Sequence, residues 1–164
     1  MGSSQRETHF ITESFSEMTE REIAQFLTCA RVGRLGMIKD AMPYIVPVGF
    51  GFWEGKIFFH TCSDGFKMAI LSQNPIVCFE VDESLSDASL AKSVVILGRV
   101  EVIDDPARMI PYLQRLIEKY RVSVSFGEYM KQRDVRDELR RVRICVITPH
   151  QVTGRRLIRK NGNF

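Results

Sequence analysis

The segment HTCSDGFK, which begins at His60, combines side chains that could bind an anion at the start of a helix. Ser63 or Asp64 could cap that helix, whose free N–H groups carry the positive end of the helix dipole. Lys67 falls in the first turn, where the helix dipole disfavours a cation unless that cation binds a phosphate. His60 and Thr61 could donate hydrogen bonds to the same group. Alternatively, Lys67 simply extends into water, and His60 is a partly buried residue that fills space.

The segment YIVPVGFGF alternates like a strand, yet it contains a proline and two glycines. Because side chains alternate across a strand, we expect one bulky face and one nearly bare face. The bulky face consists of Tyr44, Val46, Val48, Phe50 and Phe52, and the bare face of Ile45, Pro47, Gly49 and Gly51. A bare face lets a flat ring or another subunit approach the backbone. Pro47 also indicates that one side of the strand is not fully paired, and an edge strand or bulge that avoids aggregation is the alternative.

These two segments are joined by a short turn and one further strand. Trp53, Glu54 and Gly55 form the turn, and the strand KIFFHT ends at the expected anion site. A flat ring on the first strand and a phosphate at the end of the second describe a flavin mononucleotide (FMN). A flavin carries its own redox chemistry, which suits a sequence with no Gly-x-Ser-x-Gly elbow and no clustered His, Cys and Asp set.

The elements that would position these residues are mostly strands. The segment TEREIAQFLTCARVG predicts a helix, with Thr19 and Glu22 as a capping box and Gly33 as its stop. Asp105 and Pro106 predict the start of another helix, and EYMKQRDVRDELRR predicts an exposed one. The strand segments are GRLGMIKD, PYIVPVGFGF, KIFFHT, IVCFEVD, SVVILGRVEVID and VRICVITPHQV. Their short connections predict a mainly β protein, a six-stranded antiparallel barrel with peripheral helices.

Length and composition predict one ordinary globular domain. The chain has 164 residues, of which 45% are hydrophobic and 26% charged. We expect a flexible arm over residues 1–15, the barrel over 16–154 and a basic tail over 155–164. A net charge of +3 without a concentrated basic stripe argues against nucleic-acid binding. The polar N-terminus and the absence of a membrane-length apolar run predict a cytoplasmic protein that does not bind a membrane.

The cysteines and histidines do not predict a metal site. Cys29, Cys62, Cys78 and Cys145 show neither a CxxC pair nor zinc-ligand spacing. They lie in or beside apolar stretches, so we expect them to pack as small hydrophobic residues. His60 and Cys62 are close in sequence, but no third or fourth ligand stands nearby.

The stretch VGRLGMIKDAMPYIVPVGFGFWEGKIFFHTCSDGFKMAILSQNPIVCFEV resembles the flavin-binding split-barrel family related to pyridoxamine-phosphate oxidase. Within that family it is most similar to the nitroimidazole-reductase-like subgroup. The pattern G-R-L-G, then P-Y-x-V-P-V, then F-H-T with G-x-K downstream carries the resemblance. It runs from about Met18 to Ile103 and resumes weakly at ITPHQVTGR.

The resemblance implies a split barrel that forms a homodimer with two flavin sites at the subunit interface. It places the flavin ring along the backbone of the second strand segment. The residues that match this part of the site are Val46, Pro47, Val48 and Gly49. The bare face would then make room for the isoalloxazine ring, and for the partner chain.

The resemblance also implies where the phosphate binds. The matching residues are His60, Thr61 and Lys67. The basic tail has two interpretations. It is either a solvated end or a segment that folds over the partner's cofactor and contributes Arg155 to that site.

The function implied by the resemblance is reduction of small electron-poor molecules, such as nitroimidazoles, nitroaromatics or quinones, with NAD(P)H. True pyridoxamine-phosphate oxidases carry an arginine and a lysine where this chain has Tyr44 and Gly49, so vitamin B6 oxidation is not expected. Related barrels hold haem or deazaflavin instead of FMN. A non-enzymatic flavin or haem carrier, sensor or electron-transfer protein is the alternative, and a barrel without a cofactor is a third.

Overall fold

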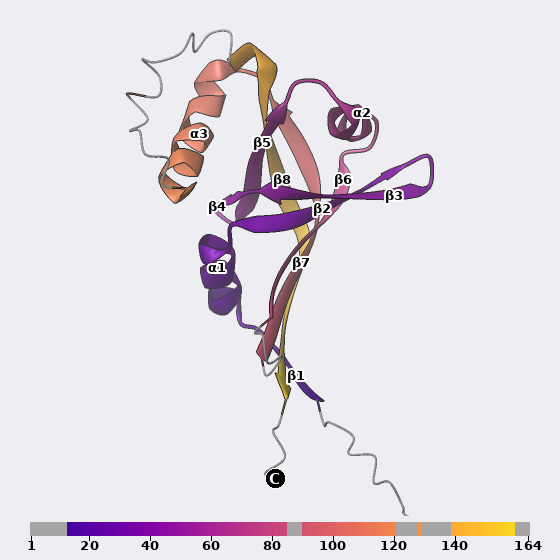
Figure 1. The fold of residues 1–164 in the computed structure, drawn as a ribbon, viewed down its shortest axis with the longest axis vertical. Coiled ribbons are helices and arrows are strands. Elements are labelled where there is room, and N and C mark those ends of the chain that lie inside the picture. Colours follow the sequence, from indigo (N-terminus) through magenta and orange to yellow (C-terminus); the bar gives the residue numbers. More distant parts are fainter. Residues whose placement is uncertain (1–12, 85–89, 121–127, 129–138, 160–164) are drawn as a thin grey trace, which may run out of the picture.

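The computed structural model describes residues 13–84, 90–120, 128 and 139–159. The β-strands are β1 (Glu13–Glu17), β2 (Val32–Lys39), β3 (Met42–Gly49), β4 (Gly51–Trp53), β5 (Lys56–Cys62), β6 (Ile76–Ser84), β7 (Leu90–Ile103) and β8 (Val142–Arg159). The α-helices are α1 (Glu20–Cys29), α2 (Phe66–Gln73) and α3 (Pro106–Tyr120). Figure 1 shows these elements on one curled sheet.

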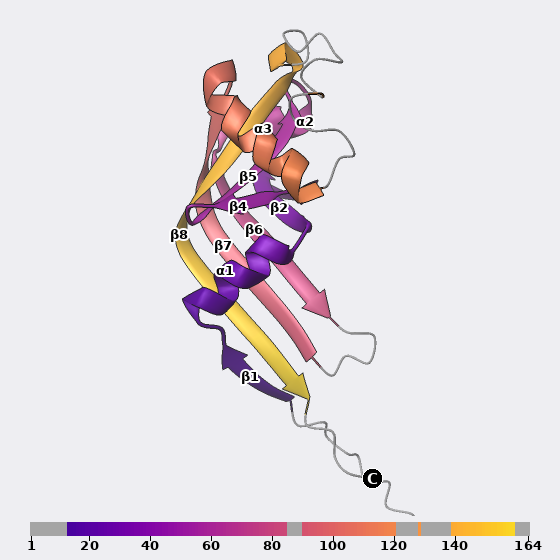
Figure 2. The ribbon, with the colours of Figure 1, turned by 90° about the vertical axis from the view of Figure 1, so that its left-hand side faces the viewer.

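The sheet is antiparallel and closes only partly into a barrel. Its strand order is β3-β2-β6-β7-β8-β5-β4, and β1 pairs with β8. Strand β8 pairs with β5 through its first half and with β1 through its last residues. Figure 2 shows the lower halves of β6, β7 and β8 running past α1 toward β1. The predicted fold, a mainly β split barrel with peripheral helices, is confirmed.

The number of strands differs from the prediction. The described residues form an eight-stranded sheet instead of a six-stranded barrel. One additional strand arises because the chain breaks between β3 and β4 at Phe50, where the sequence predicted one continuous strand. The other is β1, which forms in the segment expected to be part of a flexible arm.

The two chain ends pair with each other, which corrects the predicted boundaries at 15 and 155. Strand β1 pairs with residues Arg155–Arg159 of β8, with Glu17 opposite Arg155. The beginning of the expected basic tail is therefore an inner part of the sheet, lying between β1 and β7. The rest of the arm (1–12) and of the tail (160–164), and most of the predicted charged helix (129–138), lie outside the described residues.

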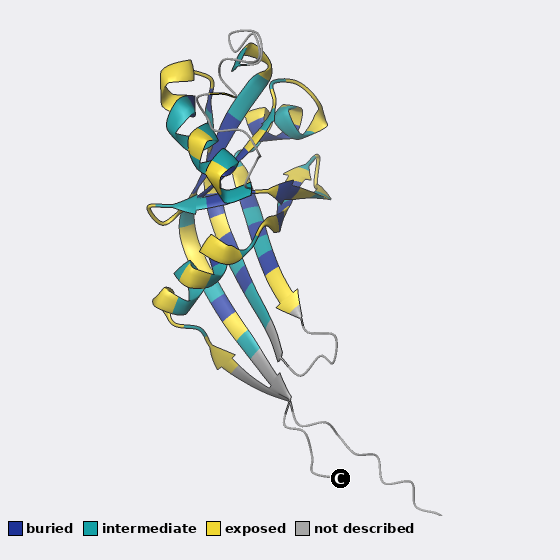
Figure 3. Ribbon diagram, turned by 60° about the vertical axis from the view of Figure 1, so that its left-hand side comes forward, coloured by how far each residue is buried: buried dark blue, intermediate teal, exposed yellow. Residues whose placement is uncertain are grey.

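The core consists of two clusters, which lie on opposite faces of β5 and β8 because their residues alternate along these strands. The larger cluster, beneath α1 and α2, includes Leu27, Leu35, Phe50, Ile70, Phe79 and Ile96. The smaller cluster, beneath α3, consists of Phe58, Ile103, Met109, Leu116, Ile144 and Val146. Figure 3 shows buried and exposed residues alternating along the long strands, as expected for a sheet covered mainly on one face. In the described part of the chain, no helix is long and apolar enough to cross a bilayer.

Helix α1 begins as predicted but ends earlier. The backbone and side chain of Thr19 and the side chain of Glu22 form the expected capping box. The helix ends at Cys29, with Ala30 as its C-cap, so Gly33 does not stop it. Gly33 lies in β2, where an added Cβ would come 2.3 Å from the ring of Phe79. That glycine is required for close packing of β2 against the core.

The cysteines do not all pack as predicted. Cys145 is buried and Cys78 is half-buried, which agrees with the prediction. Cys29 and Cys62 are exposed, because each lies at the end of its element, where the covered face of the sheet gives way to solvent.

Candidate functional site

Strand β3 lies at one end of the sheet. It pairs with β2 along its whole length, with Pro47 opposite Arg34, and no strand pairs with its other edge in the described part of the chain. This confirms that Pro47 occupies a strand with one unpaired side. The free edge leaves backbone N–H and C=O groups available to a ligand, because proteins otherwise pair or solvate these groups.

The predicted alternation of β3 is confirmed between Tyr44 and Val48. Val48 is buried, and Tyr44 and Val46 pack against the core. On the opposite face Pro47 is exposed, and 65% of Ile45 is accessible to solvent. The part of β3 that another molecule can approach is therefore centred on Ile45 and Pro47.

The two glycines do not extend this open face, which corrects the explanation given for them. Gly51 is buried in β4, and an added Cβ would come 2.1 Å from the ring of Phe58. Gly49 is at the surface, but an added Cβ would come 2.9 Å from the hydroxyl of Tyr120. Side chains of the same chain approach both glycines, so the absence of a Cβ serves packing at these positions.

Helix α2 starts without a side-chain cap. Its N-cap is Gly65, with a φ of 103°, and neither Ser63 nor Asp64 caps the helix as predicted. The first hydrogen bond within the helix joins the N–H of Ala69 to the carbonyl of Gly65. The N–H groups of residues 66–68 thus have no acceptor within the helix, as at any helix N-terminus. Lys67 lies among them, as the sequence indicated.

Lys67 acts electrostatically on the end of β5. The residue His60 is exposed to solvent. The protein around its ring nevertheless lowers the pKa of the imidazole through desolvation, and the charge of Lys67 lowers that pKa further. Burial raises the pKa of Cys145 to about 12, an effect that Lys67 opposes. The Lys67 Nζ lies 5.5 Å from the centroid of the Phe59 ring. Both effects favour the neutral form of His60, and half-buried Thr61 follows it in β5.

A direct contact joins the start of α2 to β3. The rings of Phe66 and Tyr44 meet edge to face, with centroids 5.0 Å apart. The Lys39 Nζ lies 4.9 Å from the centroid of the Phe66 ring. Phe66 itself is half exposed. The start of α2 therefore contacts β3 through Tyr44, on the covered face of the strand, whereas Ile45 and Pro47 lie on the opposite, open face.

Comparison with known proteins identifies the family. The sequence profile of the family described as pyridoxamine 5'-phosphate oxidase matches residues 19–156. The chain belongs to the pyridoxamine 5'-phosphate oxidase family. No curated protein sequence matches significantly.

Solved structures agree with this family assignment. An FAD-binding protein from Mesorhizobium loti is 26% identical, with a TM-score of 0.65 over 87% of this chain and 97% of that chain. A candidate 5-nitroimidazole antibiotic resistance protein from Bacteroides thetaiotaomicron is 18% identical, with a TM-score of 0.75 over 96% of each chain. An FAD- and haem-binding protein from Mycobacterium smegmatis is 19% identical, with a TM-score of 0.68 over 92% of this chain and 74% of that chain.

Within one chain, Arg155 lies far from His60 and the other predicted site residues. His60 pairs with Ile144 in β8, and Arg155 lies eleven residues farther along that strand. At about 3.3 Å per residue this is a separation of roughly 35 Å. Arg155 pairs instead with Ser93 in β7, at the opposite end of the sheet.

Tyr120 is the residue of this region that the sequence did not single out. Its hydroxyl lies 2.7 Å from the backbone nitrogen of Phe50 and also donates to the carbonyl of Arg31. The Arg31 guanidinium in turn lies 5.0 Å from the centroid of the Tyr120 ring. These contacts hold the end of α3 against the break between β3 and β4.

Proposed function

We propose that this family member binds FMN and uses it to reduce small electron-poor molecules, of the nitroaromatic or quinone type, with NAD(P)H. The observation that carries the proposal is the contact between the unpaired strand β3 and the uncapped start of α2. A flat ring requires an accessible strand, and its phosphate tail requires a cluster of donors nearby. The free edge of β3 is accessible, and the start of α2 contacts the same strand through Phe66 and Tyr44.

The residues present fit FMN at most of the predicted positions. The backbone of Val46, Pro47 and Val48 would face the ring along the unpaired edge of β3, which no strand of the described chain covers. The free N–H groups of α2 and the charge of Lys67 would bind the phosphate. Neutral His60 and Thr61 would each donate one hydrogen bond.

Gly49 fits FMN less well than the sequence suggested. Tyr120 occupies the space beside its Cα, so Gly49 would contribute its backbone at most. The donors at α2 form one cluster, which suits the single phosphate of FMN better than the two of FAD. A deazaflavin with a similar tail would use the same groups.

We also propose that the protein is a homodimer with the cofactor between subunits. The convex side of the sheet exposes several large apolar side chains: Ile38, Ile45, Ile76 and Leu97. Ile45 lies in register with Gly36, Cys78 and Leu97 across four strands, which makes the apolar surface continuous. Contiguous exposed apolar surface of this kind is typical of subunit interfaces. A second copy is also the route by which Arg155 could reach the site.

The chemistry in this proposal belongs to the cofactor. When bound, a flavin accepts a hydride from the nicotinamide and passes electrons to the acceptor. The chain orients the ring along β3, anchors the phosphate at α2 and excludes water through the second subunit. Lys67 and the helix dipole would stabilise negative charge on the tail.

The test is the visible absorption of the purified protein. We expect flavin bands, release of FMN on denaturation, and NAD(P)H consumption with a quinone or nitroaromatic acceptor. Lys67→Glu should reduce flavin occupancy at least about tenfold, because a charge-assisted contact becomes a repulsion. Lys56→Glu, an equal charge change at an exposed position of β5, should retain flavin. A colourless protein that takes up no added flavin would contradict the proposal.

A non-enzymatic flavin or haem carrier, sensor or electron-transfer protein is the second candidate. It is favoured by the lowered pKa of the His60 imidazole, because neutral imidazole is the form that ligates iron. A Soret band that disappears in His60→Ala would identify a haem carrier. Bound flavin without NAD(P)H turnover over a panel of acceptors would favour a flavin carrier.

A further inference from the structure

We propose that a pocket beside helix α1 binds a small organic monocarboxylate. The pocket has a volume of about 560 Å³ and opens between α1, the start of β2 and the far ends of β6, β7 and β8. This volume is within the range of about 300–1,000 Å³ that is usual for small-molecule sites. Within one chain it lies at the opposite end of the sheet from Lys67.

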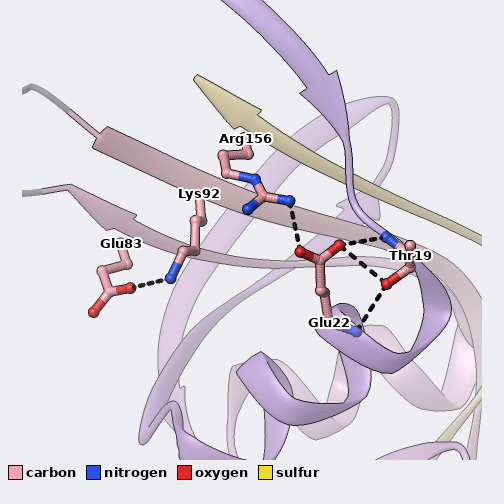
Figure 4. Close-up of polar contacts among 5 residues, drawn as sticks. All are labelled: Thr19, Glu22, Glu83, Lys92 and Arg156. Carbon is pink, nitrogen blue, oxygen red and sulfur yellow. Dashed lines mark hydrogen bonds and ion pairs between the residues drawn. The ribbon is translucent and has the colours of Figure 1, made fainter. Parts of the chain in front are cut away.

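The base of the pocket is a row of charged residues on three adjacent strands. Glu83 in β6 pairs with Lys92 in β7, which pairs with Arg156 in β8. Directly opposite residues of an antiparallel sheet lie on the same face. Figure 4 shows the side chains of Lys92 and Arg156 extending from the sheet toward α1. Two cationic groups are thus presented to one side of the pocket.

The carboxylates around the pocket already have donors. Glu22 accepts hydrogen bonds from the backbone N–H and hydroxyl of Thr19, at 2.8 and 3.0 Å, and from Arg156 Nη2 at 2.6 Å. The Thr19 contacts, and then Arg156, hold the pKa of Glu22 below its usual value. Asp82 is paired with Arg34. The pocket therefore does not need a cationic ligand to satisfy its acids.

The cationic groups keep unused donors. Among the described residues, Arg156 bonds only to Glu22, which uses one of the five guanidinium N–H groups. Its Nε is buried and has no partner. Lys92 makes one long contact of 3.5 Å, to Glu83. The buried Nε is closed to a ligand, but the remaining Nη donors of Arg156 and the ammonium of Lys92, whose side chains are about one-third exposed, can bind an anionic oxygen.

The balance of charge favours a single negative charge on the ligand. Arg31, Lys92 and Arg156 line the pocket together with Glu22, Asp82 and Glu83. With equal numbers of each sign, a phosphate of nearly two negative charges would meet repulsion from the three acids. A carboxylate can accept hydrogen bonds from the remaining Nη donors of Arg156 at half that charge.

An apolar wall completes the pocket and indicates an apolar body for the ligand. Met18, Phe26, Ala30 and Val32 line this wall. Val32 is 58% exposed although it is hydrophobic, so covering it is favourable. An aromatic or short aliphatic carboxylate would place its charge at Arg156 and its body against Phe26 and Val32.

The test is calorimetric titration of the full-length protein, with its cofactor content as purified, using benzoate as the probe. We expect saturable binding with a dissociation constant on the order of 1 mM or tighter. Benzamide, which lacks the charge, should not bind measurably, and phenyl phosphate should bind more weakly than benzoate. Absence of benzoate binding up to about 10 mM would overturn the proposal, as would tighter binding of phenyl phosphate.

Variants locate the binding site. Arg156→Gln should weaken benzoate binding at least about tenfold, since charge-assisted hydrogen bonds are lost. Lys92→Gln, which leaves the contact between Arg156 and Glu22 intact, should weaken it several-fold. Arg21→Gln removes the same charge from α1 outside the pocket and should leave the affinity within about twofold. Equal affinity in all three variants would overturn the proposal.

Flavin content separates this proposal from the proposed function. Benzoate binding depends on Arg156 and Lys92, whereas flavin binding is assigned to β3 and α2. A loss of flavin in Lys67→Glu with unchanged benzoate binding would support both. Benzoate binding that disappears in Lys67→Glu but persists in Arg156→Gln would place the anion at α2 and overturn the pocket.

Discussion

The hydroxyl of Tyr120 lies 2.7 Å from the backbone nitrogen of Phe50, which is 70 residues away in the chain. This contact occurs where the chain leaves β3 for β4. Tyr120→Phe would remove the main acceptor of the Phe50 N–H, whose other contact, to the Arg31 carbonyl, is 3.4 Å long. We expect a loss of about 1–3 kcal/mol in the free energy of unfolding, measured by urea denaturation.

Tyr112→Phe is the matched control for this substitution. Tyr112 lies on the same helix, and its ring packs against Trp53 and Phe58. Removal of its hydroxyl should change stability by less than about 0.5 kcal/mol. Equal losses in the two variants would show that the Tyr120 hydroxyl does not act through Phe50.

Gly51→Ala should destabilise the protein because Phe58 occupies the space of the new methyl group. The added Cβ would come 2.1 Å from a ring carbon of a side chain that is 1% exposed. Overpacking of this kind costs about 1–3 kcal/mol. When Phe58→Leu is also present, Gly51→Ala should reduce the free energy of unfolding by less. A double-mutant cycle measures this coupling. Additive effects would contradict a direct clash.

His60 should titrate below its usual pKa of 6.5, because burial is the larger cause of its shift and Lys67 the smaller. Lys67→Gln should raise the pKa of His60 but leave it below 6.5. An NMR titration of the histidine ring protons measures both values, and the sequence has only three histidines to assign. A His60 pKa at or above 6.5 in the native protein would refute the desolvation.

Lys119 should make stability rise with pH in the alkaline range. Burial lowers the pKa of this lysine from 10.5 to about 8, so between these values the unfolded chain binds more protons than the folded one. Unfolding free energy should therefore increase from pH 8 toward pH 10, by about 1 kcal/mol once screening of a half-exposed side chain is included. In the Lys119→Met variant, the unfolding free energy measured by urea denaturation should lack this increase between pH 8 and pH 10.

The local structure around the candidate site was predicted correctly because it depends on local rules. The alternation of β3 follows from the pleat of a strand, and the exposed edge follows from the missing N–H of Pro47. The position of Lys67 in the first turn of α2 follows from helix spacing. Each of these relations involves residues only a few positions apart.

The errors arose where long-range packing overrides local preference. Gly49 and Gly51 indicated open backbone, but Tyr120 and Phe58 fill the space beside them. The last residues of the chain appeared to be a solvated basic tail, yet Arg155 lies inside the sheet between β7 and β1. Pairing between segments more than a hundred residues apart leaves no local signal in either segment.

The sequence by itself determined the fold family, the strand-rich composition and the place of Lys67 in the first turn of a helix, because periodicity, capping and turn residues act over short distances. The tertiary structure alone decided where the chain breaks at Phe50, which side chains approach the glycines, and that Glu83, Lys92 and Arg156 form one row beneath α1. Those arrangements depend on strand register and on how the sheet curls. Both are fixed only when distant segments meet.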